Sequence, residues 1–170
     1  MQILLTETEI AARVENLAAR LAAQIDSDWA AIAVLDGAIP FVADLMRALA
    51  QRGVDPVFDA MRLSSYGDAT SSSGVVRMLS DVARPVAGRR CLLMDDVCET
   101  GGSLAFARDR LIASGALEVK IAVFALKPGA AAAVQPDFHA WDAPADRFLV
   151  GYGMDHGGRR RGLPFVAAVD

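Results

Sequence analysis

The segment from Cys91 to Leu104 (CLLMDDVCETGGSL) constrains the fold of this 170-residue chain more than any other. It opens with an apolar run of the length of a buried parallel strand, and it then places Asp95, Asp96 and Glu99 within five residues. Thr-Gly-Gly-Ser follows, and residues 104–112 carry apolar side chains at helical spacing. This order predicts an anion-binding site, because the free N–H groups of a helix N-terminus point at such a turn.

The same segment contains groups for phosphate, for ribose and for a divalent ion. Gly101 and Gly102 allow the backbone to come close to a phosphate, and the hydroxyls of Thr100 and Ser103 add donors. The adjacent acids at the strand end suit ribose hydroxyls and a hard cation such as Mg²⁺. The plainer alternative is a turn before a helix that is capped by acids. Capping does not require acids before the turn, and the segment matches neither a Walker loop nor a Gly-x-Gly-x-x-Gly loop.

Composition narrows the class of protein. Hydrophobic residues make up 54% of the chain, which predicts one domain, residues 1–170, with an ample core. A net charge of −4 without a basic patch weighs against nucleic-acid binding, and no apolar run is long enough for a membrane span. The first residues lack the pattern of a signal peptide, and Cys91 and Cys98 are expected to stay reduced. The expected location is therefore the cytoplasm.

Apolar runs and amphipathic stretches alternate along the chain. A helix is expected from Thr6 onwards, where hydroxyl and acidic residues precede an apolar stripe. Besides the central strand and helix, strands are expected at 29–35, 57–63, 75–79 and 119–126, and a helix at 39–49. The alternation predicts an α/β fold with a mainly parallel sheet flanked by helices, whose ligands bind outside the carboxyl ends of the strands.

Four expected strand ends carry polar or glycine-rich residues, namely Leu35-Asp36-Gly37, the loop 64–74, the acid cluster and Lys127-Pro128. Each has a plainer interpretation alone: a turn for Asp36-Gly37, a disordered connector for 64–74, and a surface lysine for Lys127. A loop as long as 64–74 is usually mobile or functional, and an ammonium at a strand end can donate to a carbonyl of a bound base. On one edge of a sheet, the four endings predict a site.

The C-terminal run FLVGYGMD, which begins at Phe148, reads as a short strand that enters a glycine-rich loop. Phe148 is either a core residue or a stacking surface for a heterocycle. Asp155 either holds a metal or caps the turn. The three arginines at 159–161 are either a solvated face or a clamp for pyrophosphate.

Two of these motifs resemble known signatures. Residues 95–104 resemble the phosphoribosyl-diphosphate (PRPP) binding signature of the type I phosphoribosyltransferases: an acid pair, two residues, an acid, Thr-Gly and a small or hydroxylated stretch. The FLVGYGMD run, followed by Arg161 and Leu163-Pro164, is similar to the C-terminal part of their hypoxanthine-guanine, or 6-oxopurine, branch. The resemblance covers the chain from about Leu35 to Pro164, including the turn at 35–37, the Ser-Ser-Tyr-Gly loop and Lys127-Pro128.

The resemblance implies a type I phosphoribosyltransferase-like α/β fold with a flexible lid loop at about 64–74 and a C-terminal purine-binding hood at about 128–170. It implies a purine salvage enzyme that transfers the 5-phosphoribosyl group of PRPP to N9 of hypoxanthine or guanine, giving IMP or GMP and pyrophosphate. Mg²⁺ is the implied cofactor, and a homodimer or homotetramer is the implied assembly.

The resemblance also implies a role for each matched residue. It assigns phosphate and ribose contacts to Asp95, Asp96, Thr100, Gly101, Gly102 and Ser103. Pyrophosphate contacts fall to Leu35, Asp36, Gly37, Ser65, Tyr66 and Arg161, and purine contacts to Lys127, Phe148, Leu149 and Asp155. The implied ligands of Mg²⁺ are Asp95, Asp96 and Asp155. Lys127 would donate to the purine 6-oxygen, Phe148 would stack on the ring, and the backbone of Leu149 would read the N1/C2 edge. Glu99 would remove the purine proton.

The chain departs from the family pattern at three positions. Glu99 stands where aspartate is usual, so the base reaches one methylene further. Asp36 stands where lysine is usual, and a negative charge there is unfavourable beside pyrophosphate unless a cation screens it. The acid pair is Asp95-Asp96 where this branch often has Glu-Asp.

Two alternative functions remain open. One is a relative that prefers xanthine or another base, because recognition at C2 rests largely on backbone. The other is a non-catalytic protein of the same fold that senses nucleotides or PRPP, which the residues at 36 and 99 motivate. Retention of Lys127, Phe148, Asp155 and Arg161 together weighs against the sensor, because a regulator has no need of both base and pyrophosphate contacts.

Overall fold

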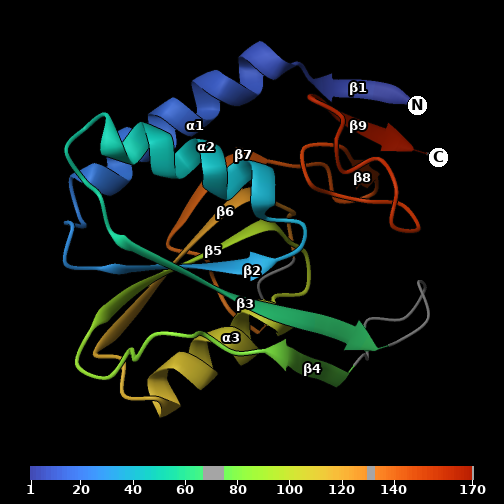
Figure 1. Ribbon diagram of the computed structural model, residues 1–170. Coiled ribbons are helices and arrows are strands. Elements are labelled where there is room, and N and C mark those ends of the chain that lie inside the picture. The colour runs from blue at the N-terminus through green and yellow to red at the C-terminus, as the bar shows by residue number, and fades with distance from the viewer. Residues whose placement is uncertain (67–74, 130–132, 170) are drawn as a thin grey trace.

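A six-stranded sheet forms the centre of the computed structural model, which describes residues 1–66, 75–129 and 133–169 (Figure 1). In spatial order its strands are β4 (Val75–Ser80), β3 (Val57–Tyr66), β2 (Ala30–Leu35), β5 (Arg90–Cys98), β6 (Glu118–Leu126) and β7 (Phe138–Asp142). The β3–β4 pair is antiparallel and the other four pairs are parallel. The expected mainly parallel α/β sheet is therefore confirmed.

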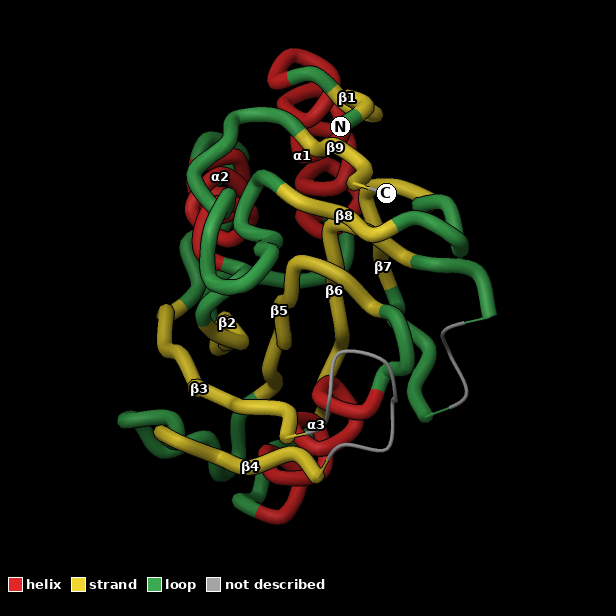
Figure 2. Tube along the Cα trace, turned by 90° about the vertical axis from the view of Figure 1, so that its right-hand side faces the viewer, coloured by secondary structure: helices red, strands yellow, loops and turns green. Residues whose placement is uncertain are grey.

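Helices cover both faces of this sheet. The helices α1 (Glu7–Ala22) and α2 (Ile39–Ala50) lie over one face, and α3 (Gly102–Ala113) lies over the other (Figures 1 and 2). On β5, Leu92 and Met94 join the core under α1 and α2, whereas Cys91 and Leu93 join the core under α3. The apolar run of the central strand is continuous because alternate residues are buried on opposite faces.

Helix α1 begins where the sequence predicted it. Thr6 and Glu9 form a capping box, in which the Glu9 carboxylate accepts from the Thr6 backbone N–H at 2.8 Å. The Thr6 hydroxyl accepts in return from the Glu9 backbone N–H at 3.4 Å. These bonds satisfy two of the N–H groups that the first turn leaves without partners.

A second, smaller sheet joins the two ends of the described chain. It consists of β1 (Gln2–Leu5), β9 (Val166–Val169) and β8 (Phe148–Val150) in the order β1-β9-β8, and all its pairs are antiparallel. The hood expected at about 128–170 thus differs from the structure in two ways. Its sheet includes the N-terminal strand β1, and β7 pairs with β6 in the large sheet.

Two strands are longer than predicted. Strand β3 ends at Tyr66 rather than near residue 63, because the backbone of 64–66 pairs with β4. Strand β5 contains Asp95 and Asp96 instead of ending before them, because β6 pairs with β5 as far as Cys98. The rest of the expected lid loop, residues 67–74, lies outside the described residues.

Other expectations concern the surface and the cysteines. Within the described ranges, no helix combines the length and apolar character needed to cross a membrane.

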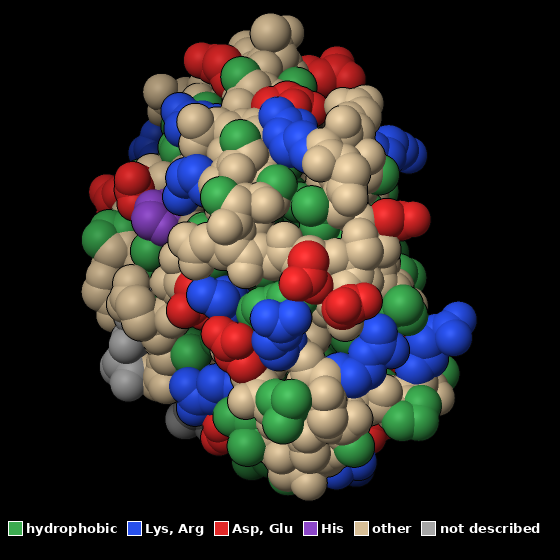
Figure 3. All heavy atoms as spheres, turned by 90° about the vertical axis from the view of Figure 1, so that its left-hand side faces the viewer, with side chains coloured by type: hydrophobic (Ala, Val, Ile, Leu, Met, Phe, Trp, Pro, Cys, Tyr) green, Lys and Arg blue, Asp and Glu red, His purple; other side chains and the backbone are tan. Residues whose placement is uncertain are grey.

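Cys91 and Cys98 are free and buried, and burial raises the pKa of both thiols, which favours their neutral form. On the face at the left of Figure 1, basic and acidic side chains are interspersed (Figure 3).

The aromatic centre of the larger core gives the first prediction. The Phe124 ring is fully buried, and its centroid lies 4.9 Å from that of Tyr152 and 5.8 Å from that of Phe41. Phe124→Ala is expected to lower the free energy of unfolding in urea by about 3–5 kcal/mol, because it leaves a cavity. The matched control Phe58→Ala removes a half-exposed ring and should cost about 1 kcal/mol or less. Equal losses in the two variants would contradict this account of the core.

Candidate active site

Three neighbouring strand ends of the large sheet form one edge, onto which Figure 2 looks. The turn 35–37 follows β2, the segment 95–103 ends β5 and begins α3, and Lys127 follows β6. The Lys127 backbone N–H donates to the Cys98 carbonyl at 3.0 Å, which joins the second and third of these groups. The loop after β8 closes on the first, because a Cβ at Gly153 would overlap the carbonyl oxygen of Gly37.

The turn between β5 and α3 has the geometry of an anion site. Gly101 is left-handed at φ 73°, and a Cβ there would lie 3.0 Å from a side-chain carbon of Val134. Gly101 has no side chain to cap α3, and the first helical N–H, that of Gly102, makes only a long bond of 3.4 Å to the Thr100 hydroxyl. A ligand can therefore accept from the first N–H groups of the helix. A hollow of about 220 Å³ lies here, lined by every residue from Asp95 to Leu104.

The two adjacent carboxylates of this hollow are the most buried acids of the site. Burial raises the pKa of Asp95 well above its usual range, and the Asp96 charge adds to the effect. Burial also raises the pKa of Asp96, opposed by hydrogen bonds and by the charge of Arg161. Each carboxylate accepts from the next backbone N–H at 2.8 Å, which fixes its direction. Groups that offer protons or positive charge would stabilise this pair.

A second hollow of about 140 Å³ adjoins the first and shares Asp96, Val97 and Glu99 with it. Lys127 lines it with only 7% of its surface exposed, so the interpretation as a surface lysine is wrong. Its ammonium lies 2.8 Å from the Glu99 carboxylate. The structure thus brings together the residues predicted for base binding and for proton transfer.

Two residues of β8 complete this hollow. Phe148 is half-exposed at 50% and lies against the His156 ring, with the centroids 5.5 Å apart, so the interpretation as a core residue is also wrong. Leu149 is buried, and its strand is held by pairing with Ala168 of β9. A half-exposed aromatic ring that lines the same hollow as a buried ammonium can receive a flat heterocycle that carries an acceptor.

The turn after β2 approaches the acid pair closely. The Leu35–Asp36 peptide is cis. A Cβ at Gly37 would lie 2.0 Å from an oxygen of Asp96, so only glycine leaves room for that carboxylate. Asp36 does not stand alone, because its carboxylate lies 2.9 Å from the guanidinium of Arg62 on β3.

Arg161 reaches the same region from the other side. Its guanidinium donates to the Gly153 carbonyl at 2.6 Å and forms an ion pair with Asp155 at 2.8 Å. Asp155 also accepts from the backbone N–H of Gly158 at 2.6 Å, so it does cap its turn. Arg161 is therefore held at the site, while Arg159 and Arg160 are exposed, as a solvated face would be.

The two residues predicted for the lid, Ser65 and Tyr66, form the end of β3, where their backbone pairs with β4.

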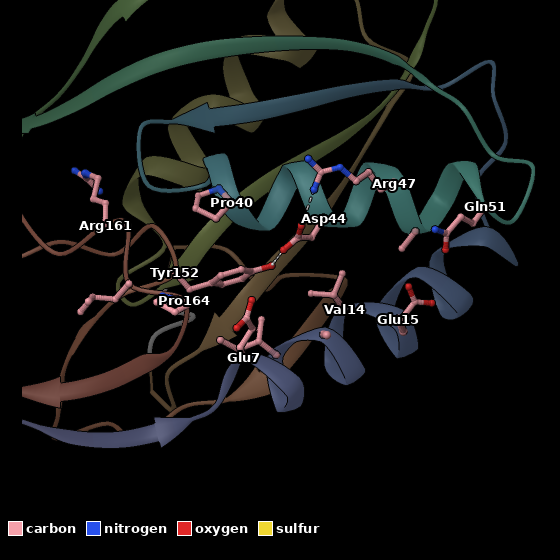
Figure 4. Close-up of a pocket in the computed structure, with 15 residues that line it drawn as sticks. Glu7, Val14, Glu15, Pro40, Asp44, Arg47, Gln51, Tyr152, Arg161 and Pro164 are labelled. Carbon is pink, nitrogen blue, oxygen red and sulfur yellow. Dashed lines mark hydrogen bonds and ion pairs between the residues drawn. The ribbon is translucent and has the colours of Figure 1, made fainter.

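Sequence reasoning missed Arg62, which lies at the turn after β2, and Tyr152, which joins the loop after β8 to α2. Arg62 was an inconspicuous cation in an expected strand, and only the strand register places it beside Asp36. Tyr152 lies within the FLVGYGMD run, where the sequence predicts no role for it, yet its hydroxyl donates to Asp44 of α2 at 2.8 Å (Figure 4). Burial and the Asp44 carboxylate raise the pKa of Tyr152, so the phenol stays protonated as a donor.

A larger hollow of about 500 Å³ lies between α1, α2 and the loop near Pro164. Figure 4 shows the residues that line it. Arg161 lines it, but the acid pair and Lys127 do not. Size alone would favour this hollow as the active site. The convergent charged groups instead favour the two smaller hollows.

The acids fit a metal ion that is shared with a ligand. Across residues 1–66, 75–129 and 133–169, no three His, Cys, Asp or Glu side chains are grouped so as to hold an ion. Asp95 and Asp96 offer the carboxylate oxygens that Mg²⁺ prefers, and Asp155 is engaged by Arg161. An ion here would take most of its ligands from water and from a bound phosphate.

These features define a protein that binds a phosphorylated ligand at the carboxyl edge of a parallel sheet, next to a pocket for a flat ring. The family model described as phosphoribosyl transferase domain matches residues 5–156. The chain belongs to this family, and the resemblance seen in its motifs is confirmed.

Similar proteins include the hypoxanthine-guanine phosphoribosyltransferase of Mycobacterium tuberculosis, which is 37% identical over 99% of this chain and 85% of its own length. That of Bacillus subtilis is 35% identical over 99% and 92%. A point mutant of the Trypanosoma cruzi hypoxanthine phosphoribosyltransferase, solved as a ternary substrate complex, has a TM-score of 0.89 and 28% identity over 100% of this chain and 95% of that one. The structure of a Staphylococcus aureus hypoxanthine phosphoribosyltransferase has a TM-score of 0.90 and 26% identity, and the match covers 100% of this chain and 91% of that one.

The paired glycines of the anion site allow a sharp test. Gly101→Ala is expected to lower the free energy of unfolding in urea by about 1–2 kcal/mol, because an L side chain is strained in the left-handed region and would press on Val134. Gly102→Ala is the matched control, since its Cβ would meet only the Thr100 hydroxyl, at 3.7 Å. If both variants unfold at the same urea concentration as wild type, Gly101 is not constrained as described.

Proposed function

We propose that this protein is a purine salvage enzyme that transfers the 5-phosphoribosyl group of PRPP to N9 of hypoxanthine or guanine, giving IMP or GMP and pyrophosphate. The observation that carries the proposal is the adjacency of the two hollows, which share Asp96, Val97 and Glu99 as lining. One suits a phosphorylated sugar and the other a flat ring. A reaction that joins the two would take place at their common border.

The base end is proposed to recognise a 6-oxopurine. Lys127 is held at the carboxyl edge of the sheet, and its ammonium offers hydrogen-bond donors but no acceptor. It therefore suits a 6-oxygen and not a 6-amino group. Phe148 offers its exposed face for stacking, and the backbone of Leu149 reads the N1/C2 edge. Because backbone reads C2, a preference for xanthine or another base remains the alternative.

The sugar end is proposed to hold PRPP at both of its phosphate groups. The backbone at 100–102 and the hydroxyls of Thr100 and Ser103 bind the 5′-phosphate, and Asp95 and Asp96 accept from the ribose hydroxyls. Leu35, Asp36, Gly37 and Arg161 meet the pyrophosphate, and Ser65 and Tyr66 belong to the lid that covers it. The Arg161 charge already acts on the Asp96 carboxylate, which supports this arrangement.

The chemistry is a displacement at C1′. The bond from C1′ to the pyrophosphate oxygen breaks, the bond from C1′ to N9 forms, and the purine loses a proton. Glu99 is proposed to take that proton, since it lines both hollows and its side chain is 63% exposed. Arg161 stabilises the charge that develops on the leaving group.

Mg²⁺ is proposed to accompany PRPP, with Asp95 and Asp96 near one ion and Asp155 near a second. When bound, the ion neutralises charge on the pyrophosphate. A homodimer or homotetramer and a cytoplasmic location remain predictions from the resemblance.

The sensor alternative loses much of its motivation. Asp36 is one of the two residues that motivate it, and the Arg62 guanidinium offsets the Asp36 charge at 2.9 Å. Glu99 is the other, and its carboxylate lies 2.8 Å from the Lys127 ammonium at the base pocket.

The decisive assay measures pyrophosphate release from PRPP and Mg²⁺ with hypoxanthine, guanine, xanthine or adenine. Wild type should turn over with hypoxanthine or guanine, and Glu99→Gln should be slower by about 100-fold or more, because an amide cannot take the proton. Glu118→Gln, at the opposite end of β6, is the matched control and should behave as wild type. Turnover that survives Glu99→Gln would remove Glu99 as the base. No release with any base, alongside nucleotide binding, would overturn the transferase.

Lys127→Met tests base recognition separately. The kcat/KM for hypoxanthine should fall about 10–100-fold, because a hydrogen bond from a charged donor to the 6-oxygen is lost. The KM for PRPP should stay near that of wild type. Lys120→Met is the control, because Lys120 lies on β6, the strand that precedes Lys127, and donates to Gln24; it should leave both constants unchanged. An unchanged kcat/KM for Lys127→Met would exclude Lys127 from the base site.

A further inference from the structure

We infer that Arg62 binds the pyrophosphate group of PRPP from the β3 side of the Gly37 turn, and that Asp36 positions it there. This inference rests on the proposed function. It assigns to Arg62 the positive charge that the turn itself lacks, since the middle residue of the turn is an acid.

The strand register places Arg62 beside the turn. Strands β2 and β3 are parallel, and their last paired residues are Leu35 and Arg62. The chain of β2 then turns at Asp36 and Gly37 while β3 continues, so the Arg62 side chain lies alongside the residues that leave the sheet. The Nη2 atom of Arg62 donates to the Asp36 carboxylate at 2.9 Å.

Arg62 retains donors for a second acceptor. A guanidinium has five N–H groups, and the contact with Asp36 uses one nitrogen. The side chains of Arg62 and Asp36 are 53% and 40% exposed, so the pair is open to a ligand. A planar guanidinium that is already directed by a carboxylate suits bidentate binding of phosphate oxygens.

The turn lies between two cations of different origin. Arg161 approaches it from the loop after β8, since it donates to the carbonyl of Gly153 and Gly153 packs on Gly37. Arg62 approaches from the large sheet. Pyrophosphate bound at the Gly37 turn would therefore meet a guanidinium on each side, and the Asp36 charge would be offset by its partner.

The competing explanation is an ordinary surface ion pair with no ligand. Such a pair contributes little to stability and nothing to binding. Arg90 and Asp26 provide the matched control, because their exposed pair spans 3.2 Å and Arg90 begins β5 at the opposite edge of the sheet.

The test is calorimetric binding of magnesium pyrophosphate and of PRPP to wild type, Arg62→Met, Arg90→Met, Asp36→Lys and the double variant Asp36→Lys/Arg62→Met. Arg62→Met should weaken both ligands about 10–100-fold at unchanged melting temperature. The double variant should regain most of this loss, because it moves the positive charge from β3 into the turn. Arg90→Met should bind as wild type does.

The outcomes separate the inference from the proposed function. Wild-type affinity in Arg62→Met, or a double variant as weak as Arg62→Met, would overturn the role of Arg62 even if turnover with hypoxanthine is normal. Arg62-dependent pyrophosphate binding without turnover on any base would sustain the inference and overturn the transferase.

Discussion

The arrangement of the site depends on keeping two adjacent carboxylates out of water at the end of a buried strand. Asp95 and Asp96 lie on β5 beyond Met94, the last residue of that strand to pair with β2. Burial opposes their ionisation, so their surroundings must compensate. Backbone N–H groups supply part of the compensation. The glycine at position 37 leaves the space that Asp96 occupies, which explains why the turn and the acid pair form one unit.

Around this pair, three cations of the described residues are each held by a carboxylate. Lys127 is held by Glu99, Arg161 by Asp155, and Arg62 by Asp36. Pairing fixes the direction of long side chains before a ligand arrives, which lowers the entropy lost on binding. It also limits the repulsion among the acids of a chain that is negative overall. The two acids that depart from the family pattern, Asp36 and Glu99, are thus each offset by a neighbouring cation.

The sequence predicted well those features that are encoded locally. The strand, turn and helix of residues 91–112 follow from apolar spacing and from two glycines, and the cap of α1 follows from Thr6 and Glu9. Features that depend on distant partners were not accessible. Strands β1 and β9 have four residues each, and they form because the N-terminal and C-terminal segments pair with each other. The contact of Arg62 with Asp36 depends on the register of β2 and β3. Periodicity carries no information on either.

The pairing of β1 with β9 also sets an order of events during synthesis on the ribosome. The anion-binding hollow is lined by residues of β5 and α3, and β2 and β6, the neighbours of β5, are complete by Leu126. The adjoining hollow needs β8, which is paired with β9, which in turn is paired with β1. A nascent chain therefore holds the N-terminal strand without its partner until residues 166–169 emerge. The residues that line the hollow for the ring therefore finish emerging only after all the residues that line the anion-binding hollow.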